Sequence, residues 1–225
     1  MKLNADLDLR VVLHTPDIAW VASPAHGVNR RMLDRIGDEV AVATTIVQYL
    51  PQTQFHSHVH GGGEEILVLA GQFSDEYGDY PAGTYLRNPP GSAHTPRPEE
   101  GCTIFVKLRQ FLAGDTQRLR IDSRSATWVS GATPGVALLP LHEHGGILTL
   151  LQRWSPHTAL PARLHPQGLE LFVIEGCLHD ELGRYPAGTW LRSPRGSTQT
   201  PFTLAEGALV YVKTGHIGAP FFPGS

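Results

Sequence analysis

The residues best suited to chemistry lie in one short stretch, FHSHVHGGGEE at positions 55–65. His58 and His60 are two residues apart, so on an extended strand both imidazoles point to the same face. Glu64 follows a run of three glycines, which allows the backbone to turn its carboxylate back toward the imidazoles. His94, in the sequence PPGSAHTP, would add a third imidazole from a neighbouring strand. Three neutral imidazoles and one carboxylate favour a divalent first-row metal such as Zn, Mn, Fe, Ni or Cu over Ca or Mg.

These residues also complete a two-part motif. HSHVHGGGEEILVLAG, followed by GTYLRNPPGSAH, resembles the cupin signature His-x-His-x3-Glu-x6-Gly and Gly-x5-Pro-x-Gly-x2-His. The other fixed positions of the signature are filled by Gly71, Gly83, Pro89 and Gly91. The longer sequence around the motif, GGEEILVLAGQFSDEYGDYPAGTYLRNPPGSAHTP, is similar to the cupin domain of ChrR-type anti-sigma factors and their free-standing relatives. The resemblance covers about residues 20–110, and more weakly the rest. It implies that the metal ligands here are His58, His60, Glu64 and His94.

An internal repeat shows how the chain must position this site. DEYGDYPAGTYLRNPPGSAHTP at 75–96 recurs as DELGRYPAGTWLRSPRGSTQTP at 180–201, which is 105 residues later. Each copy has short runs of β-branched and aromatic residues between Gly, Pro and Asp turns, and few segments have a helical period. We therefore predict an all-β protein of two tandem cupin domains, each a jelly roll (double-stranded β-helix), at 1–116 and 117–225.

The expected strands follow from the same runs. Those of the first copy are at 40–50, 65–74, 84–87 and 103–111, and those of the second are at 147–154, 169–179, 189–192 and 208–214. The join is expected in the polar run 114–130, where LRIDSRSATW can add a strand of its own.

The repeat also provides an internal control for the metal site. At the same offset, the four candidate ligands correspond to Arg163, His165, Leu169 and Gln199. A single histidine is a poor site for a divalent ion, so the second domain is predicted to be degenerate, a structural or pocket-forming partner without metal. Glu65 has a counterpart in Glu170, whereas Glu64 corresponds to leucine. Glu64 is therefore the predicted ligand, and Glu65 is predicted to make a structural hydrogen bond.

Other histidines admit two interpretations. His56 has the same strand parity as His58 and is an alternate ligand, although the solvent end of the strand is the favoured place for it. His142 and His144 imitate the motif but align well ahead of the ligand strand. We expect these two to be surface or core histidines.

Further residues are ambiguous in the same way. Arg87 and Arg192 occur in both copies, which favours a structural ion pair or backbone contact over binding of a substrate carboxylate. Aromatic residues of the barrel strands are packing residues by default; these are Tyr49, Tyr85 and Phe105, with Tyr49 as a further pocket candidate. Cys102 and Cys177 fit no metal or disulfide spacing and are expected to be small buried side chains.

Composition and charge exclude several classes of partner. With 225 residues, 41% of them hydrophobic, the chain has ample material for a core. Its 18 basic and 21 acidic residues give a net charge of −3, and no block of like charge indicates nucleic acid or a charged membrane. The sequence has neither a signal peptide nor a long apolar run, so we expect a protein of the reducing cytoplasm with no membrane partner.

The predicted ligand set leaves one or two coordination positions open, as in a catalytic or sensing site. One hypothesis is a metal-dependent enzyme acting on a small oxygenated molecule, as a dioxygenase with iron or an isomerase or hydrolase with zinc or manganese. The expected cofactor is one divalent transition metal, Zn, Fe, Mn or Ni. The expected partners are a small-molecule ligand or substrate and, through sheet edges, a second copy in a homodimer.

The second hypothesis follows from the resemblance, which implies a ligand-sensing or oxidant-sensing regulatory cupin. ChrR-type regulators carry a zinc-binding anti-sigma domain with a His-x3-Cys-x2-Cys pattern. This sequence lacks that pattern, so direct inhibition of a sigma factor is not expected. A third hypothesis is a structural bicupin whose metal only stabilises the fold.

Overall fold

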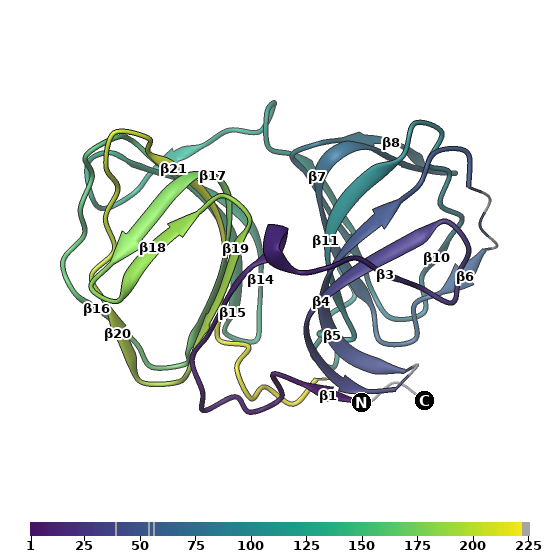
Figure 1. Ribbon diagram of the computed structural model, residues 1–225, viewed down its shortest axis with the longest axis horizontal. Coiled ribbons are helices and arrows are strands. Elements are labelled where there is room, and N and C mark those ends of the chain that lie inside the picture. Colours follow the sequence, from purple (N-terminus) through teal and green to yellow (C-terminus); the bar gives the residue numbers. More distant parts are fainter. Residues whose placement is uncertain (39, 54, 56, 222–225) are drawn as a thin grey trace. The chain divides into compact units, whose positions relative to one another are not determined.

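The computed structural model describes residues 1–38, 40–53, 55 and 57–221 (Figure 1). Within this part, the chain contains strands, one 3-10 turn (η1, Thr15–Asp17) and no α-helix. It divides into two compact units, one with residues 1–5, 18–126 and 220–221, the other with residues 6–17 and 127–219. The prediction of an all-β protein with two tandem units is confirmed. No helix in the described residues is long and apolar enough to span a membrane.

The first unit is built on one large sheet, in which the strand order is β1-β4-β5-β11-β7-β9-β12. These strands are β1 Lys2–Leu3, β4 Val28–Gly37, β5 Ala41–Tyr49, β7 Glu64–Asp75, β9 Thr84–Asn88, β11 Cys102–Leu108 and β12 Leu119–Asp122. Two strands pair off this path, β3 (Val21–Ala22) with β4 and β8 (Gly78–Pro81) with β7. A second sheet pairs β6 (His58–Val59) with β10 (Ala93–His94), and it carries two of the candidate ligands.

The second unit repeats this plan with the order β13-β14-β15-β21-β17-β19-β2. Its large sheet contains β2 Val11–His14, β13 Val129–Ser130, β14 Val136–His144, β15 Ile147–Trp154, β17 Leu169–Asp180, β19 Thr189–Ser193 and β21 Ala208–Thr214. β18 (Gly183–Pro186) pairs with β17, and a two-stranded sheet joins β16 (Arg163–His165) to β20 (Ser197–Gln199).

The last strand of each large sheet comes from outside the expected domain boundaries. β12 pairs with β9 of the first unit, although it follows residue 116. β2 pairs with β19 of the second unit, although it lies near the start of the chain. The physical reason is that β9 and β19 would otherwise leave backbone hydrogen-bonding groups unpaired at an edge. Residues 6–17 and 117–126 therefore belong to the opposite units from those expected.

Each core lies on the face of the sheet where alternate strand residues meet. In the first unit, Ile66 and Val68 of β7 pack with Leu86 of β9 and with Ile104 and Val106 of β11. The matching residues of the second unit are Leu171, Val173, Leu191, Val210 and Val212. Burying one such side chain contributes about 1.5–3 kcal/mol, so this alternation fixes which residues of β7 and β17 face the interior.

A glycine-dependent bulge occurs at the same place in both units. The register of β7 against β11 shifts between Thr103 and Ile104, and Gly71 beyond the shift has φ +69°. A Cβ on Gly71 would lie 2.4 Å from a backbone carbonyl oxygen. Gly176 of β17 repeats both features, with φ +69° and a carbonyl oxygen 2.3 Å away. Glycine is required at both positions because a side chain would meet rigid backbone.

Candidate metal centre

Three histidines converge at the small sheet of the first unit. β6 and β10 are antiparallel with His94 directly opposite His58, and the backbone N–H of His60 donates to the carbonyl of Ser92 at 2.8 Å. The ring centroids are 4.9 Å apart for His58 and His60, 4.9 Å for His58 and His94, and 4.7 Å for His60 and His94. One ligand nitrogen of each ring lies within 4.8 Å of the other two. The strand pairing thus places three imidazoles around one point.

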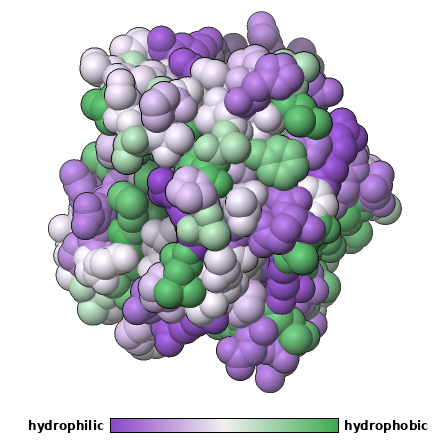
Figure 2. All heavy atoms as spheres, turned by 90° about the vertical axis from the view of Figure 1, so that its left-hand side faces the viewer, coloured by the Kyte–Doolittle hydropathy of each residue, from purple (hydrophilic) through white to green (hydrophobic). Residues whose placement is uncertain are grey.

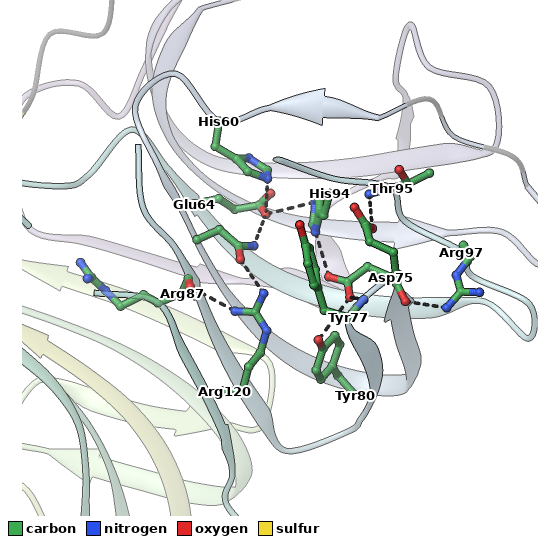
Figure 3. A network of polar contacts seen from close by, with 12 residues as sticks. His60, Glu64, Asp75, Tyr77, Tyr80, Arg87, His94, Thr95, Arg97 and Arg120 are labelled. Carbon is green, nitrogen blue, oxygen red and sulfur yellow. Dashed lines mark hydrogen bonds and ion pairs between the residues drawn. The ribbon is translucent and has the colours of Figure 1, made fainter. Parts of the chain in front are cut away.

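Glu64 completes the group from the first position of β7. It has the same strand parity as the core residues Ile66 and Val68, so its carboxylate points into the barrel. Its Oε2 lies 3.6 Å from Nε2 of His60 and 3.7 Å from Nε2 of His94 (Figure 3). The structure therefore brings all four residues singled out by the sequence motif together.

The turn that aims Glu64 depends on Gly63. This residue has φ +79°, and a Cβ there would lie 2.4 Å from the ring of Phe111. The glycine run before Glu64 thus has the role expected of it, since it lets the chain reverse closely against a packed aromatic side chain.

The donors fit a divalent metal ion because one buried ring nitrogen has no hydrogen-bond partner. Nε2 of His60 is buried and has no hydrogen-bond partner. Burial lowers the pKa of His60; the charge of Glu64 opposes this shift, while His94 and His58 add to it. A buried nitrogen without a hydrogen-bond partner lowers the stability of the fold by about 1–3 kcal/mol. An ion held between the imidazoles and the Glu64 carboxylate would satisfy that nitrogen.

Asp75 orients His94 toward the centre. Oδ2 of Asp75 lies 3.2 Å from Nδ1 of His94, while its Oδ1 accepts from the Tyr77 N–H at 2.8 Å and the Tyr80 hydroxyl at 3.2 Å (Figure 3). Burial raises the pKa of Asp75, but hydrogen bonds from His94, Tyr77 and Tyr80 outweigh it and lower the pKa overall. An ionised Asp75 can only accept, so Nδ1 of His94 carries the proton and Nε2 keeps a lone pair for the centre.

Glu64 is held in a similar way by a chain of polar contacts. Nδ2 of Asn88 donates to Oε2 of Glu64 at 3.2 Å, and Arg120 donates to Oδ1 of Asn88 at 2.8 Å. Arg120 lies on β12, so the edge strand completes the support of the site. The sequence reasoning missed Asp75, Asn88 and Arg120. One available signal was that Asp75 recurs in the second copy as Asp180.

Glu65 and the two repeated arginines have structural contacts. The Tyr85 hydroxyl donates to Oε1 of Glu65 at 2.5 Å. Arg87 forms two 2.8 Å hydrogen bonds to the carboxylate of Asp115. Arg192 donates to the backbone carbonyl of Asp6 at 2.8 Å. These contacts agree with the structural interpretations of the sequence.

The remaining candidates belong to other elements or lie outside the described residues. His142 and His144 lie on β14 with ring centroids 6.4 Å apart. His56 lies outside the described residues. Cys102 and Cys177 are free and buried, and burial raises the pKa of the Cys102 thiol to about 12, which keeps it protonated.

A cavity of about 610 Å³ leads to the donor group. His58 and Glu64 form part of its wall, and the rest is mainly apolar, including Val106 and Phe55. Tyr49 also lines the cavity; burial, followed by the charge of Glu64, raises the pKa of its hydroxyl well above the usual range. The Tyr49 hydroxyl is therefore protonated in the cavity wall, and one side of the centre faces a space the size of a small molecule.

The second unit keeps the scaffold without the donor set. β16 pairs with β20 so that Arg163 is opposite Gln199, as His58 is opposite His94. Leu169 starts β17 where Glu64 starts β7. Within the described residues, the cluster of at least three His, Cys, Asp or Glu side chains close enough to share an ion is that of the first unit. That the second unit binds no metal stays a prediction.

Comparisons with known proteins bear on the family and the fold. The family model of the ChrR cupin-like domain matches residues 8–112 and again residues 116–218. Among curated proteins, none matches this sequence.

Several solved structures are similar along almost the whole chain. A candidate dioxygenase from Nostoc punctiforme has 16% identity and a TM-score of 0.79, covering 94% of this chain and 85% of its own. Oxalate decarboxylase from Bacillus subtilis has 12% identity and a TM-score of 0.61, covering 91% and 76%. A pirin from Escherichia coli, solved in complex with nickel(II), has 11% identity and a TM-score of 0.67, covering 92% and 99%. At these identities the likeness shows a shared fold.

Proposed function

We propose that this chain, which belongs to the ChrR cupin-like domain family, is a metal-dependent bicupin enzyme acting on a small oxygenated molecule. The ion would be held by His58, His60, Glu64 and His94. The observation that carries the proposal is the position of two of these donors, His58 and Glu64, in the wall of a mainly apolar cavity of about 610 Å³. A purely structural ion is enclosed by its ligands, whereas an ion here would have a side open to a second molecule.

The residues around the centre suit a reaction of a bound organic molecule. A divalent first-row metal bound there would supply a Lewis acid or, in the case of iron, a centre for dioxygen chemistry. The apolar wall formed by Val47, Ile104 and Val106 would bind the carbon skeleton of the substrate and exclude water. The Tyr49 hydroxyl, kept protonated by burial, can donate a hydrogen bond to a substrate oxygen. A dioxygenase, or an isomerase or hydrolase, is the reaction class we propose.

The identity of the ion is part of the proposal. Imidazole and carboxylate donors accept Zn, Fe, Mn and Ni, so the donor types alone do not choose between them. Asp75 would make His94 a more basic ligand through its hydrogen bond to Nδ1, whichever ion is bound.

The test is turnover by protein loaded separately with Fe(II), Mn(II), Zn(II) and Ni(II). Oxygen uptake and product mass spectrometry would be followed with dicarbonyl, phenolic and thiol substrates. We expect one ion to support turnover, and the Glu64→Ala variant loaded with the same ion to lose it. The His165→Ala variant is the matched control from the second unit and should keep full activity. Turnover that survives Glu64→Ala would contradict the assignment.

The family match favours a second candidate, a cupin that senses a ligand or an oxidant. In that case the same four residues bind the ion and the cavity binds the signal, but nothing is turned over. A substrate-sized molecule that binds the loaded protein, shifts its thermal unfolding and is recovered unchanged would favour this function over an enzyme.

A further inference from the structure

We propose that the barrel of the second unit binds a small apolar carboxylate, whose carboxyl group is held by Arg163 and His165 without a metal ion. This site is separate from the metal centre and does not depend on it. It occupies the place in the second unit that the donor group occupies in the first.

The body of the ligand would lie in a cavity of about 600 Å³ inside the second barrel. Most of the residues that line it are aliphatic. Among them are the buried core residues Leu150, Leu171, Val210 and Val212. The view of the second unit in Figure 2 shows green hydrophobic residues among the purple hydrophilic ones on this side of the molecule. An apolar cavity of this volume suits a chain or ring system of roughly ten carbon atoms.

The head group would meet two nitrogen donors on β16. Arg163 lines the cavity, is exposed, and pairs with no carboxylate among the described residues. Nε2 of His165 is buried and has no hydrogen-bond partner. A carboxylate can accept from both groups at once, and the guanidinium geometry suits it especially well.

The carboxylate of Asp180 would not repel a bound anion strongly, because neighbouring groups already compensate its charge. Oδ2 of Asp180 accepts from Nε2 of Gln199 at 3.1 Å and lies 3.5 Å from a guanidinium nitrogen of Arg10. Its Oδ1 accepts from the Tyr185 hydroxyl at 2.5 Å. Asp180 thus has a full set of donors and fixes Gln199 in the wall.

The two units differ in the sign of charge at equivalent positions. In the first unit, the carboxylate of Glu64 beside three imidazoles attracts a cation. In the second unit, Leu169 removes that carboxylate and Arg163 replaces His58 with a permanent cation. The same backbone positions therefore favour a cation in one barrel and an anion in the other.

The unpaired histidine supports this interpretation. Burial, and next the charge of Arg163, lowers the pKa of His165, so the ring is neutral near pH 7. A neutral imidazole has one N–H, which can donate to one carboxylate oxygen while Arg163 binds the other.

The experiment is calorimetric titration of decanoate into the full chain, with a chelator present so that no ion contributes. We expect saturable binding of about one equivalent, and a loss of about 10–100-fold in affinity in Arg163→Gln, the range for a hydrogen-bonded charged group. The matched control is His58→Gln in the first unit, which should bind decanoate as the unchanged protein does. Decanol, which has the same chain without the charge, should bind at least 10-fold more weakly than decanoate, with little effect from Arg163→Gln.

A second variant keeps the test decisive if Arg163→Gln is poorly folded. Leu148 is partly buried and lines the cavity, so Leu148→Trp should fill space and weaken decanoate binding while the protein still unfolds cooperatively. No saturable binding to the unchanged protein, equal affinity in Arg163→Gln, or loss of binding in His58→Gln would each overturn the proposal.

Discussion

Replacing Asp75 with asparagine should weaken metal binding while leaving the shape of the site almost unchanged. The asparagine Oδ1 can still accept from the Tyr77 N–H and the Tyr80 hydroxyl, which contact Oδ1 of Asp75 at 2.8 and 3.2 Å. The atom that faces Nδ1 of His94, now 3.2 Å away as Oδ2, would become an NH2 donor. Nδ1 of His94 would then have to accept, so the ring proton moves to Nε2, where the lone pair for the metal is needed.

The expected loss of metal affinity follows from the changed tautomer of one ligand, His94. Removing an outer hydrogen-bond partner of a ligating histidine typically costs 10–100-fold in metal affinity, which is about 1.4–2.8 kcal/mol. We expect Asp75→Asn to fall in this range, because His94 can still bind after its tautomer changes.

The assay is competition with a chromophoric chelator for Zn(II) and Co(II) at pH 7.5. Asp180→Asn in the second unit is the matched control. The residue hydrogen-bonded to Asp180 is Gln199, and its side-chain amide can turn so that its oxygen accepts from the new asparagine. An Asp75→Asn protein that is folded and binds metal as tightly as the unchanged protein would refute the reasoning, and so would an equal loss in Asp180→Asn.

Three further predictions concern stability. Gly71→Ala should lower the free energy of unfolding by about 1–3 kcal/mol because of its positive φ, and by more because the new Cβ would meet a backbone carbonyl oxygen. Gly91 also has a positive φ, but a Cβ there would meet nothing within 4 Å, so Gly91→Ala should show the cost of the φ alone in thermal unfolding. Arg87→Leu should lower the free energy of unfolding in urea by about 3–5 kcal/mol, because it removes the guanidinium that pairs with the buried carboxylate of Asp115. Adding Asp115→Asn should recover part of that loss. Without metal, the pKa of His60 in the folded protein lies below the ordinary histidine value of 6.5, so at acid pH the unfolded chain binds more protons than the folded one. The free energy of unfolding should therefore fall as the pH drops below 6.5. His60→Gln should reduce this pH dependence, measured by thermal unfolding between pH 5.5 and 7.5.

The sequence was sufficient for the central strands and for the four candidate donors. The expected strands at 147–154 and 208–214 coincide with β15 and β21, because apolar residues alternate along them between clear turns. The donors were accessible for a similar reason, since the spacing of His58, His60 and Glu64 encodes a strand and a turn. His94 was accessible through the second half of the motif.

Other features depend on contacts that no local pattern contains. β4 reads VNRRMLDRIG, and its many polar residues conceal a strand of ten residues. β2 is short, and what makes it a strand is the unpaired edge of β19 far along the sequence. A strand was expected in LRIDSRSATW, where β12 lies, but its pairing with β9 could not be read from the sequence. The support of the donors by Asn88 and Arg120 has the same origin, because β12 has to be in place before Arg120 reaches Asn88.

The most direct test of the central claim is the metal content of the full chain, purified without an affinity tag or chelator, beside two variants. The account predicts about one equivalent of a divalent transition metal in the unchanged protein and in His165→Ala, and none in the double variant His58→Ala/His60→Ala. Metal retained by the double variant, or lost equally from His165→Ala, would contradict a single site built from His58, His60, Glu64 and His94.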